Sequence, residues 1–144
     1  MSKLISPYEI VAKSALPALR AMVAKRLQGE YHLTQQEVAR RLGVTQASVS
    51  NYARKTRGMM VDLEGDETVA KAADVIAREL SSSEPDQREA LKSMTDVLDY
   101  IRFNKMMCAL HGDLEPGFPV EGCYACEGTF SEKNFDRLKV LIGT

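Results

Sequence analysis

The stretch that decides the fold is LTQQEVARRLGVTQASVSNYARKTRG, residues 33–58. Thr34 and Glu37 have the spacing of a capping box, in which each side chain accepts a hydrogen bond from the backbone N–H of the other residue. This pattern predicts that a helix begins at Gln35, and the apolar periodicity predicts that the helix ends at Leu42.

A second helix is predicted after a short turn. Gly43 suits the left-handed backbone of a helix end, and Thr45 is an N-cap for a helix that we expect to reach Tyr52 or slightly beyond. Two short helices joined by such a glycine-containing turn form a helix-turn-helix. Ala39 is small where the two helices would cross. The positions predicted to face inward are Val38, Leu42, Val44, Val49 and Tyr52.

This stretch resembles the motif of the lambda-repressor-like and Cro-like regulators, the XRE family, whose usual run is TQxEVAxxLGVxxxxVSxxxxG. The resemblance implies an all-α, lambda-repressor-like bundle whose second motif helix enters the major groove of double-stranded DNA. Gln and Asn can pair with adenine there, and an alanine methyl can contact the thymine methyl. The candidate base-reading residues are Thr45, Gln46, Ala47, Ser48, Ser50 and Asn51.

Two further groups are candidate phosphate contacts. Gln35 and Gln36 stand at the positive N-terminal end of the first motif helix, where the resemblance places phosphate contacts. Arg54, Lys55 and Arg57 follow the recognition helix toward the DNA backbone. Two other readings remain open: the helix pair simply packs in a bundle, or the scaffold holds another protein as an adaptor or coactivator.

Charge is unevenly distributed along the 144 residues, although the formal net charge is only −1. Residues 20–58 carry eight basic and two acidic side chains, a balance of +6, whereas residues 59–144 have a balance of −8. A positive segment is expected of a phosphate-binding surface, and a solvated helix face is the alternative.

The sequence excludes several classes of protein. It contains no run of 18 apolar residues and no secretion-signal pattern at its start, so we expect a cytoplasmic protein without a membrane segment. No glycine-rich phosphate loop and no nucleophile elbow occur, so we expect no enzyme.

Helical periodicity also dominates the flanks of the motif. A helix is predicted from Pro7 to about Gln28, where Pro17 either kinks it or lies in the first turn of a second helix. Another helix is predicted over 67–80. With the motif at 34–58, we expect a DNA-binding domain over 1–82 and a C-terminal part over 83–144.

The C-terminal part is predicted to begin with a long helix, about residues 86–107. Its apolar seam can bury itself on its own chain or join a second copy, and we favour a homodimer because helix-turn-helix proteins usually read two half-sites. A last helix is predicted over 130–142. The seam consists of Leu91, Met94, Leu98 and Ile101.

The three cysteines and one histidine form the pattern Cys108-x2-His111-x11-Cys123-x2-Cys126. Four nitrogen and sulfur ligands at such spacing predict a small metal-bound region, with structural zinc favoured and an iron–sulfur cluster as the alternative. Buried thiols beside a surface histidine are the plain alternative.

The leading segment adds a second resemblance. With LPALR at residues 16–20, the chain is similar to a group of predicted archaeal transcriptional regulators that carry an LPAIR-type phrase, the same motif and a C-terminal cysteine cluster. The ligand order here departs from theirs, because Cys123 and Cys126 lie downstream of Cys108 and His111.

Overall fold

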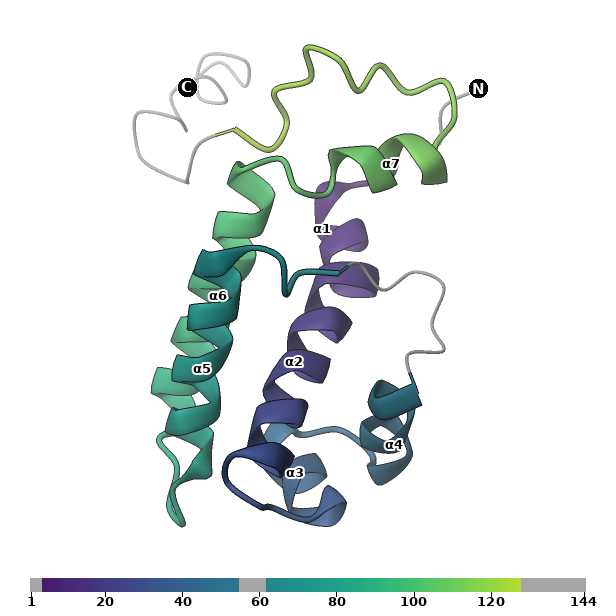
Figure 1. Ribbon diagram of the computed structural model, residues 1–144. Helices are drawn as coiled ribbons and strands as arrows, with labels where there is room; N and C mark the ends of the chain where they lie inside the picture. The colour runs from purple at the N-terminus through teal and green to yellow at the C-terminus, as the bar shows by residue number, and fades with distance from the viewer. Residues whose placement is uncertain (1–3, 55–61, 128–144) are drawn as a thin grey trace, which may run out of the picture.

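The computed structural model describes residues 4–54 and 62–127, and the regular elements in these ranges are all helices (Figure 1). A continuous rod runs the length of the molecule, with two short helices at its lower end, an antiparallel pair beside it and one short helix at its upper end. The elements are α1 (Pro7–Ile10), η1 (Val11–Ala15), α2 (Leu16–Gly29), α3 (Gln35–Leu42), α4 (Gln46–Arg54), α5 (Glu67–Ser81), α6 (Gln87–Phe103) and α7 (Cys108–Leu114).

The rod consists of α1, η1 and α2, and it passes Pro17 without ending. η1 is one turn of π-helix, in which the Leu16 N–H donates to the Val11 carbonyl five residues back. Proline has no N–H and its ring crowds the carbonyl of the preceding turn, so a wider turn just upstream accommodates it. Both predicted outcomes hold in part: Pro17 lies in the first turn of α2, while the helical backbone continues into α2 from η1.

The helix-turn-helix forms as predicted from the sequence. α3 spans the predicted residues, Gly43 ends it with φ +70°, and the Thr45 hydroxyl accepts the Ser48 N–H at 3.0 Å to begin α4. The N–H groups of Gly43 and Val44 both donate to the Ala39 carbonyl. The predicted inward positions are fully buried at Val38 and Val49 and half-buried against the core at Leu42, Val44 and Tyr52.

The predicted capping box is only half formed. The Thr34 hydroxyl accepts the Glu37 N–H at 3.2 Å, as expected. The Glu37 carboxylate, however, binds the guanidinium groups of Arg40 and Arg41 in place of the Thr34 backbone. Two charged partners outcompete one backbone N–H for the same carboxylate because hydrogen bonds between charged groups are stronger.

The C-terminal helices depart further from the prediction. α5 matches the expected 67–80, but the long helix expected over 86–107 ends at Phe103. Lys105 then adopts φ +57°, and the next turn buries Met107 before α7 begins. The side chain of Met107 lies 3.5 Å from the buried Ser14 hydroxyl of η1, so packing on the rod determines where α6 stops.

The apolar seam of α6 is used mainly within its own chain. Ile101 is fully buried, and Ala90 and Val97 of the same helix are also buried. Met94 and Leu98 are half-buried against the same core. Leu91 alone among the predicted seam residues is exposed, at 64%. The buried residues of both predicted domains thus belong to one core, while the helix predicted over 130–142 lies outside the described residues.

Gly43 and Gly29 provide a matched test of the turn. A Cβ would meet no atom within 4 Å at either position, but only Gly43 has a positive φ. Gly43→Ala is therefore expected to lower the free energy of unfolding by about 1 to 2 kcal/mol through backbone strain. Gly29→Ala is expected to leave it unchanged or to raise it by up to about 1 kcal/mol, because alanine favours helix. Urea denaturation of both variants measures the difference, and equal effects would contradict it.

Glu37 predicts an acid-sensitive contribution to stability. Hydrogen bonds from Arg40 and Arg41 lower its pKa from 4.5 to about 2. Because the folded pKa is depressed, the stabilisation is present above pH 4.5 and is lost as the pH falls toward 2. Wild type should therefore exceed Glu37→Gln in free energy of unfolding at pH 6, and the difference should shrink below pH 4.5.

Glu67→Gln removes an exposed carboxylate from an i,i+4 ion pair with Lys71 and controls for the loss of a surface charge. A gap between wild type and Glu37→Gln that stays constant from pH 6 to pH 2.5 would contradict the prediction.

Candidate nucleic-acid interface

The candidate DNA-reading residues gather at the lower end of the rod, where α3 and α4 lie (Figure 1). α4 is anchored by Val49, which is fully buried, so the residues around it on the helix face outward or lie at the edge. Gln36, Thr45, Gln46 and Ala47 are exposed. The half-buried members of the set are Gln35, Ser48, Ser50 and Asn51.

One member of this set, Thr45, is also a helix cap. Thr45 accepts the Ser48 N–H, and the two hydroxyl oxygens lie 2.9 Å apart. A cap residue stabilises the helix start that presents its neighbours, so Thr45 has a structural role here in addition to the predicted one. The side chains of Gln46 and Ala47 project beyond this cap into solvent. The structure therefore offers an amide and a methyl group at the positive end of α4.

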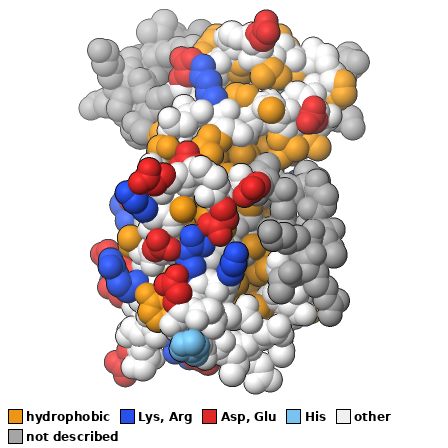
Figure 2. All heavy atoms as spheres, viewed as in Figure 1, with side chains coloured by type: hydrophobic (Ala, Val, Ile, Leu, Met, Phe, Trp, Pro, Cys, Tyr) orange, Lys and Arg blue, Asp and Glu red, His pale blue; other side chains and the backbone are white. Residues whose placement is uncertain are grey.

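The predicted positive surface is partly an internal ion-pair network. Arg26 is only 13% exposed and binds Glu64 at 2.9 Å and also Asp74. Arg41 is 8% exposed and binds Glu37. On the face in Figure 2, basic and acidic side chains alternate, with no extended area of one sign. The +6 balance of residues 20–58 therefore overstates the charge available to phosphates.

Other basic residues remain for a polyanion. Lys25 is exposed on α2, and Arg40 is 66% exposed at the end of α3, where it also pairs with Glu37. Lys55 and Arg57 lie outside the described residues, as does the side chain of Arg54. Their predicted phosphate contacts stay predictions.

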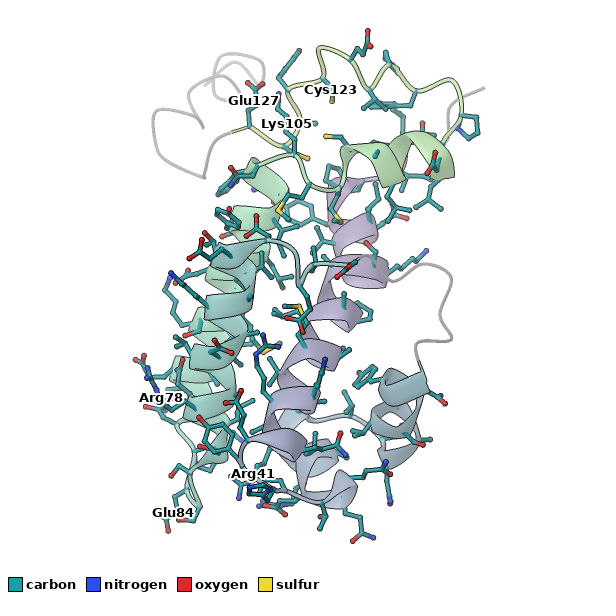
Figure 3. All side chains as sticks on the ribbon, viewed as in Figure 1. Arg41, Arg78, Glu84, Lys105, Cys123 and Glu127 are labelled. Atoms are coloured by element: carbon teal, nitrogen blue, oxygen red, sulfur yellow. The ribbon has the colours of Figure 1, made fainter. Side chains whose placement is uncertain are left out.

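The predicted metal ligands lie at the opposite end of the molecule, where Figure 3 labels Cys123. Among residues 4–54 and 62–127, no group of three or more His, Cys, Asp and Glu side chains is arranged to hold a metal ion. The described residues therefore give no support for a metal site made of Cys108, His111, Cys123 and Cys126. Zinc and the iron–sulfur cluster stay predictions without structural support.

His111 makes two contacts that the sequence analysis does not predict. Its Nε2 lies 3.1 Å from a carboxylate oxygen of Glu115, one helical turn away, and its ring stacks on Phe118 with centroids 4.3 Å apart. Both His111 and Glu115 are buried. The Glu115 carboxylate also accepts the backbone N–H groups of Leu4 and Ile5 at 2.9 and 2.7 Å. The histidine therefore helps to fasten the N-terminal segment to α7.

The pKa of Glu115 reflects this arrangement. Burial raises it, but the hydrogen bonds from Ile5, His111 and Leu4 outweigh burial, so the pKa lies below its usual value. A carboxylate with three donors remains ionised in a buried position. The i,i+4 spacing of His111 and Glu115 was the sequence signal for this contact, whereas the contact with the N-terminal segment had none.

The three thiols lie near one another. Cys108 and Cys126 line a cavity of about 10 Å³ together with His111 and Arg102, and all three cysteines are free. Burial and the nearby Cys108 and Cys123 raise the pKa of Cys126, although Arg102 opposes the shift. Lys105 pairs with Glu127 at 2.8 Å beside them. The thiols are half-buried and the histidine is buried, so the alternative of buried thiols with a surface histidine is not matched either.

None of the helices in the described ranges is both long enough and apolar enough to cross a membrane.

Comparison with known proteins identifies the lower end of the molecule. Residues 23–58 match the family model described as Helix-turn-helix, which is about a quarter of the chain and includes α3, α4 and the end of α2. No curated protein and no solved structure shows significant similarity to the chain. The match and the geometry of α3 and α4 agree on a helix-turn-helix, and this supports a DNA-binding regulator of transcription.

Proposed function

We propose that the protein is a sequence-specific transcriptional regulator that binds double-stranded DNA with α4 in the major groove. The observation that carries the proposal is that the N-terminal part of α4 faces solvent within a segment that matches a helix-turn-helix family. The buried Val49 anchors α4, and the turn at Gly43 joins it to α3. Base edges in the major groove are read by side chains at this position in such motifs.

The chemistry of the exposed residues fits this role. Gln46 can donate to and accept from an adenine edge, and the Ala47 methyl can contact a thymine methyl. Gln35 and Gln36 stand in the first turn of α3, where backbone N–H groups and the helix dipole favour a phosphate. Phosphate contacts position the protein on the duplex, whereas base contacts specify the sequence, so mutations of the two kinds of residue have different effects on binding.

A homodimer is part of the proposal. Two half-sites about 34 Å apart on one face of the duplex would be read by two copies. Leu91 of α6 is a large apolar side chain with 64% exposure, which supports a contact through the α5–α6 side of the molecule. That the protein regulates transcription and catalyses no reaction also stays a prediction.

The first test is a gel shift with genomic DNA fragments at moderate salt, followed by selection of a preferred duplex from a random library. Retarded bands that survive competition by random duplex are expected. An adaptor that uses the same scaffold to hold another protein would show no such band, and this outcome would overturn DNA binding.

Gln46→Ala and Arg54→Ala separate reading from attraction. Gln46→Ala is expected to lower the free energy of binding to the selected duplex by about 1 to 3 kcal/mol and to change binding to random duplex little. Arg54→Ala is expected to weaken binding to both duplexes by the same factor, because loss of a phosphate contact does not depend on the sequence. With ~6 phosphate contacts, the slope of log affinity against log salt should be near −5. Equal loss of specificity in the two variants would contradict the division of roles.

Leu91→Glu tests the dimer. Light scattering of the wild type at micromolar concentration is expected to give about 32 kDa, twice the 16.0 kDa of one chain. Leu91→Glu should lower this mass because burying a carboxylate in an apolar contact is unfavourable. Lys13→Gln, an exposed substitution on η1 and outside the α5–α6 pair, should not change it. A wild-type mass of 16 kDa would remove the dimer from the proposal.

A further inference from the structure

We propose that Arg41 is a positioning residue for DNA recognition: it binds the C-terminal end of α5 and thereby fixes the orientation of α3 and α4. The inference rests on the proposed DNA binding. From its sequence position, Arg41 belongs to the basic segment expected to attract phosphates. The structure assigns it to the inside of the molecule.

The contacts of Arg41 join α3 to the end of α5. Its Nε lies 2.8 Å from the Glu37 carboxylate in α3. Its Nη1 donates to the Leu80 carbonyl at 2.6 Å and also to the Ser82 carbonyl, both at the end of α5. Figure 3 shows Arg41 at the lower end of the molecule, between α3 and the end of α5. With 8% of its side chain exposed, it is not available to a DNA phosphate.

The end of α5 needs such a partner. The last carbonyls of a helix lack partners within the helix, and a glycine in left-handed conformation often satisfies them. α5 instead ends at Ser81 and is followed by Ser82 in extended backbone, with φ −60° and ψ 149°. A guanidinium group can fill this role, and its positive charge also interacts favourably with the negative end of the helix dipole. Arg41 therefore caps α5 from another helix.

The α5 end that Arg41 holds is itself tied to α6. The Ser93 hydroxyl of α6 donates to the Glu79 carboxylate of α5 at 2.8 Å, one residue before Leu80. α3 is therefore joined to the α5–α6 pair by directional hydrogen bonds as well as by apolar packing. Apolar contacts tolerate small rotations, whereas a planar guanidinium with three acceptors specifies an orientation. This orientation decides whether α4 meets the groove correctly.

Arg40 provides a matched control. It precedes Arg41 in the same helix and pairs with the same Glu37, but its side chain is 66% exposed at the surface. Replacing either arginine by glutamine removes one positive charge from the end of α3. Both variants lose one positive charge, and the exposed Arg40 is the better placed of the two for direct contact with phosphates. A loss of discrimination between duplexes that occurs only in Arg41→Gln therefore reports positioning.

The experiment measures affinity for a duplex selected by the wild type and for a random duplex of equal length. Arg40→Gln is expected to lower both affinities by a similar factor. Arg41→Gln is expected to lower the affinity for the selected duplex about tenfold more than that for the random duplex, because base contacts need accurate placement and phosphate contacts need less. Arg41→Lys keeps the charge but not the planar fork, and is expected to recover part of the specificity. Equal ratios for the Arg40→Gln and Arg41→Gln variants would overturn the proposal.

Hydrogen exchange without DNA gives an independent measurement. Amides of residues 46–52 should exchange faster in Arg41→Gln than in wild type and Arg40→Gln, because α4 loses its fixed support. Unchanged exchange there would overturn the positioning role whatever the DNA data show. If the wild type does not distinguish the selected from the random duplex, the proposed function fails, and the exchange data still decide whether Arg41 holds α4. Should Arg41→Gln fail to fold, Arg41→Lys supplies both measurements.

Discussion

The rod from Pro7 to Gly29 is the constraint on which the rest of the described structure depends. α3, α4 and α5 pack on α2, α6 packs on η1, and α7 packs on α1. Burying a large aliphatic side chain contributes about 1.5 to 3 kcal/mol to the free energy of unfolding, so the buried side chains of the rod are a major source of stability. Both ends of the molecule share it, which joins the helix-turn-helix and the cysteine region in one core. The fully buried side chains of the rod include Ile10, Leu19, Val23 and Leu27.

The sequence predicts the helix-turn-helix well because the signals for it are local. Thr34 caps α3, Gly43 ends it and Thr45 caps α4, and each acts within four residues of its own position. The same holds for the start of α5, where the Asp66 carboxylate accepts the Val69 N–H at 2.9 Å. Such signals depend little on distant parts of the chain. They therefore identify these elements and the outward-facing residues of the candidate interface from sequence alone.

The features that the sequence does not predict depend on distant contacts. α6 stops early because Met107 packs on the rod, and no glycine or proline marks that position. Arg41 counts as a free positive charge until α5 is placed beside it. The cysteine–histidine spacing gives no sign that the His111 side chain contacts Glu115 and Phe118. Residue type and spacing state what a side chain is able to bind, whereas its neighbours in the fold decide what it does bind.

The π-turn at Val11–Ala15 also sets the phase between the two ends of the rod. Each residue of an α-helix advances the side-chain direction by about 100°, and a π-turn places one additional residue within a turn. The direction in which α1 meets α7 is therefore offset from the direction in which α2 meets α3 and α5. One rod can thus present Ile10 to the upper contacts and Leu27 to the lower ones in different rotational registers. Losing a single residue in this turn would rotate the cysteine region about the rod axis relative to the helix-turn-helix.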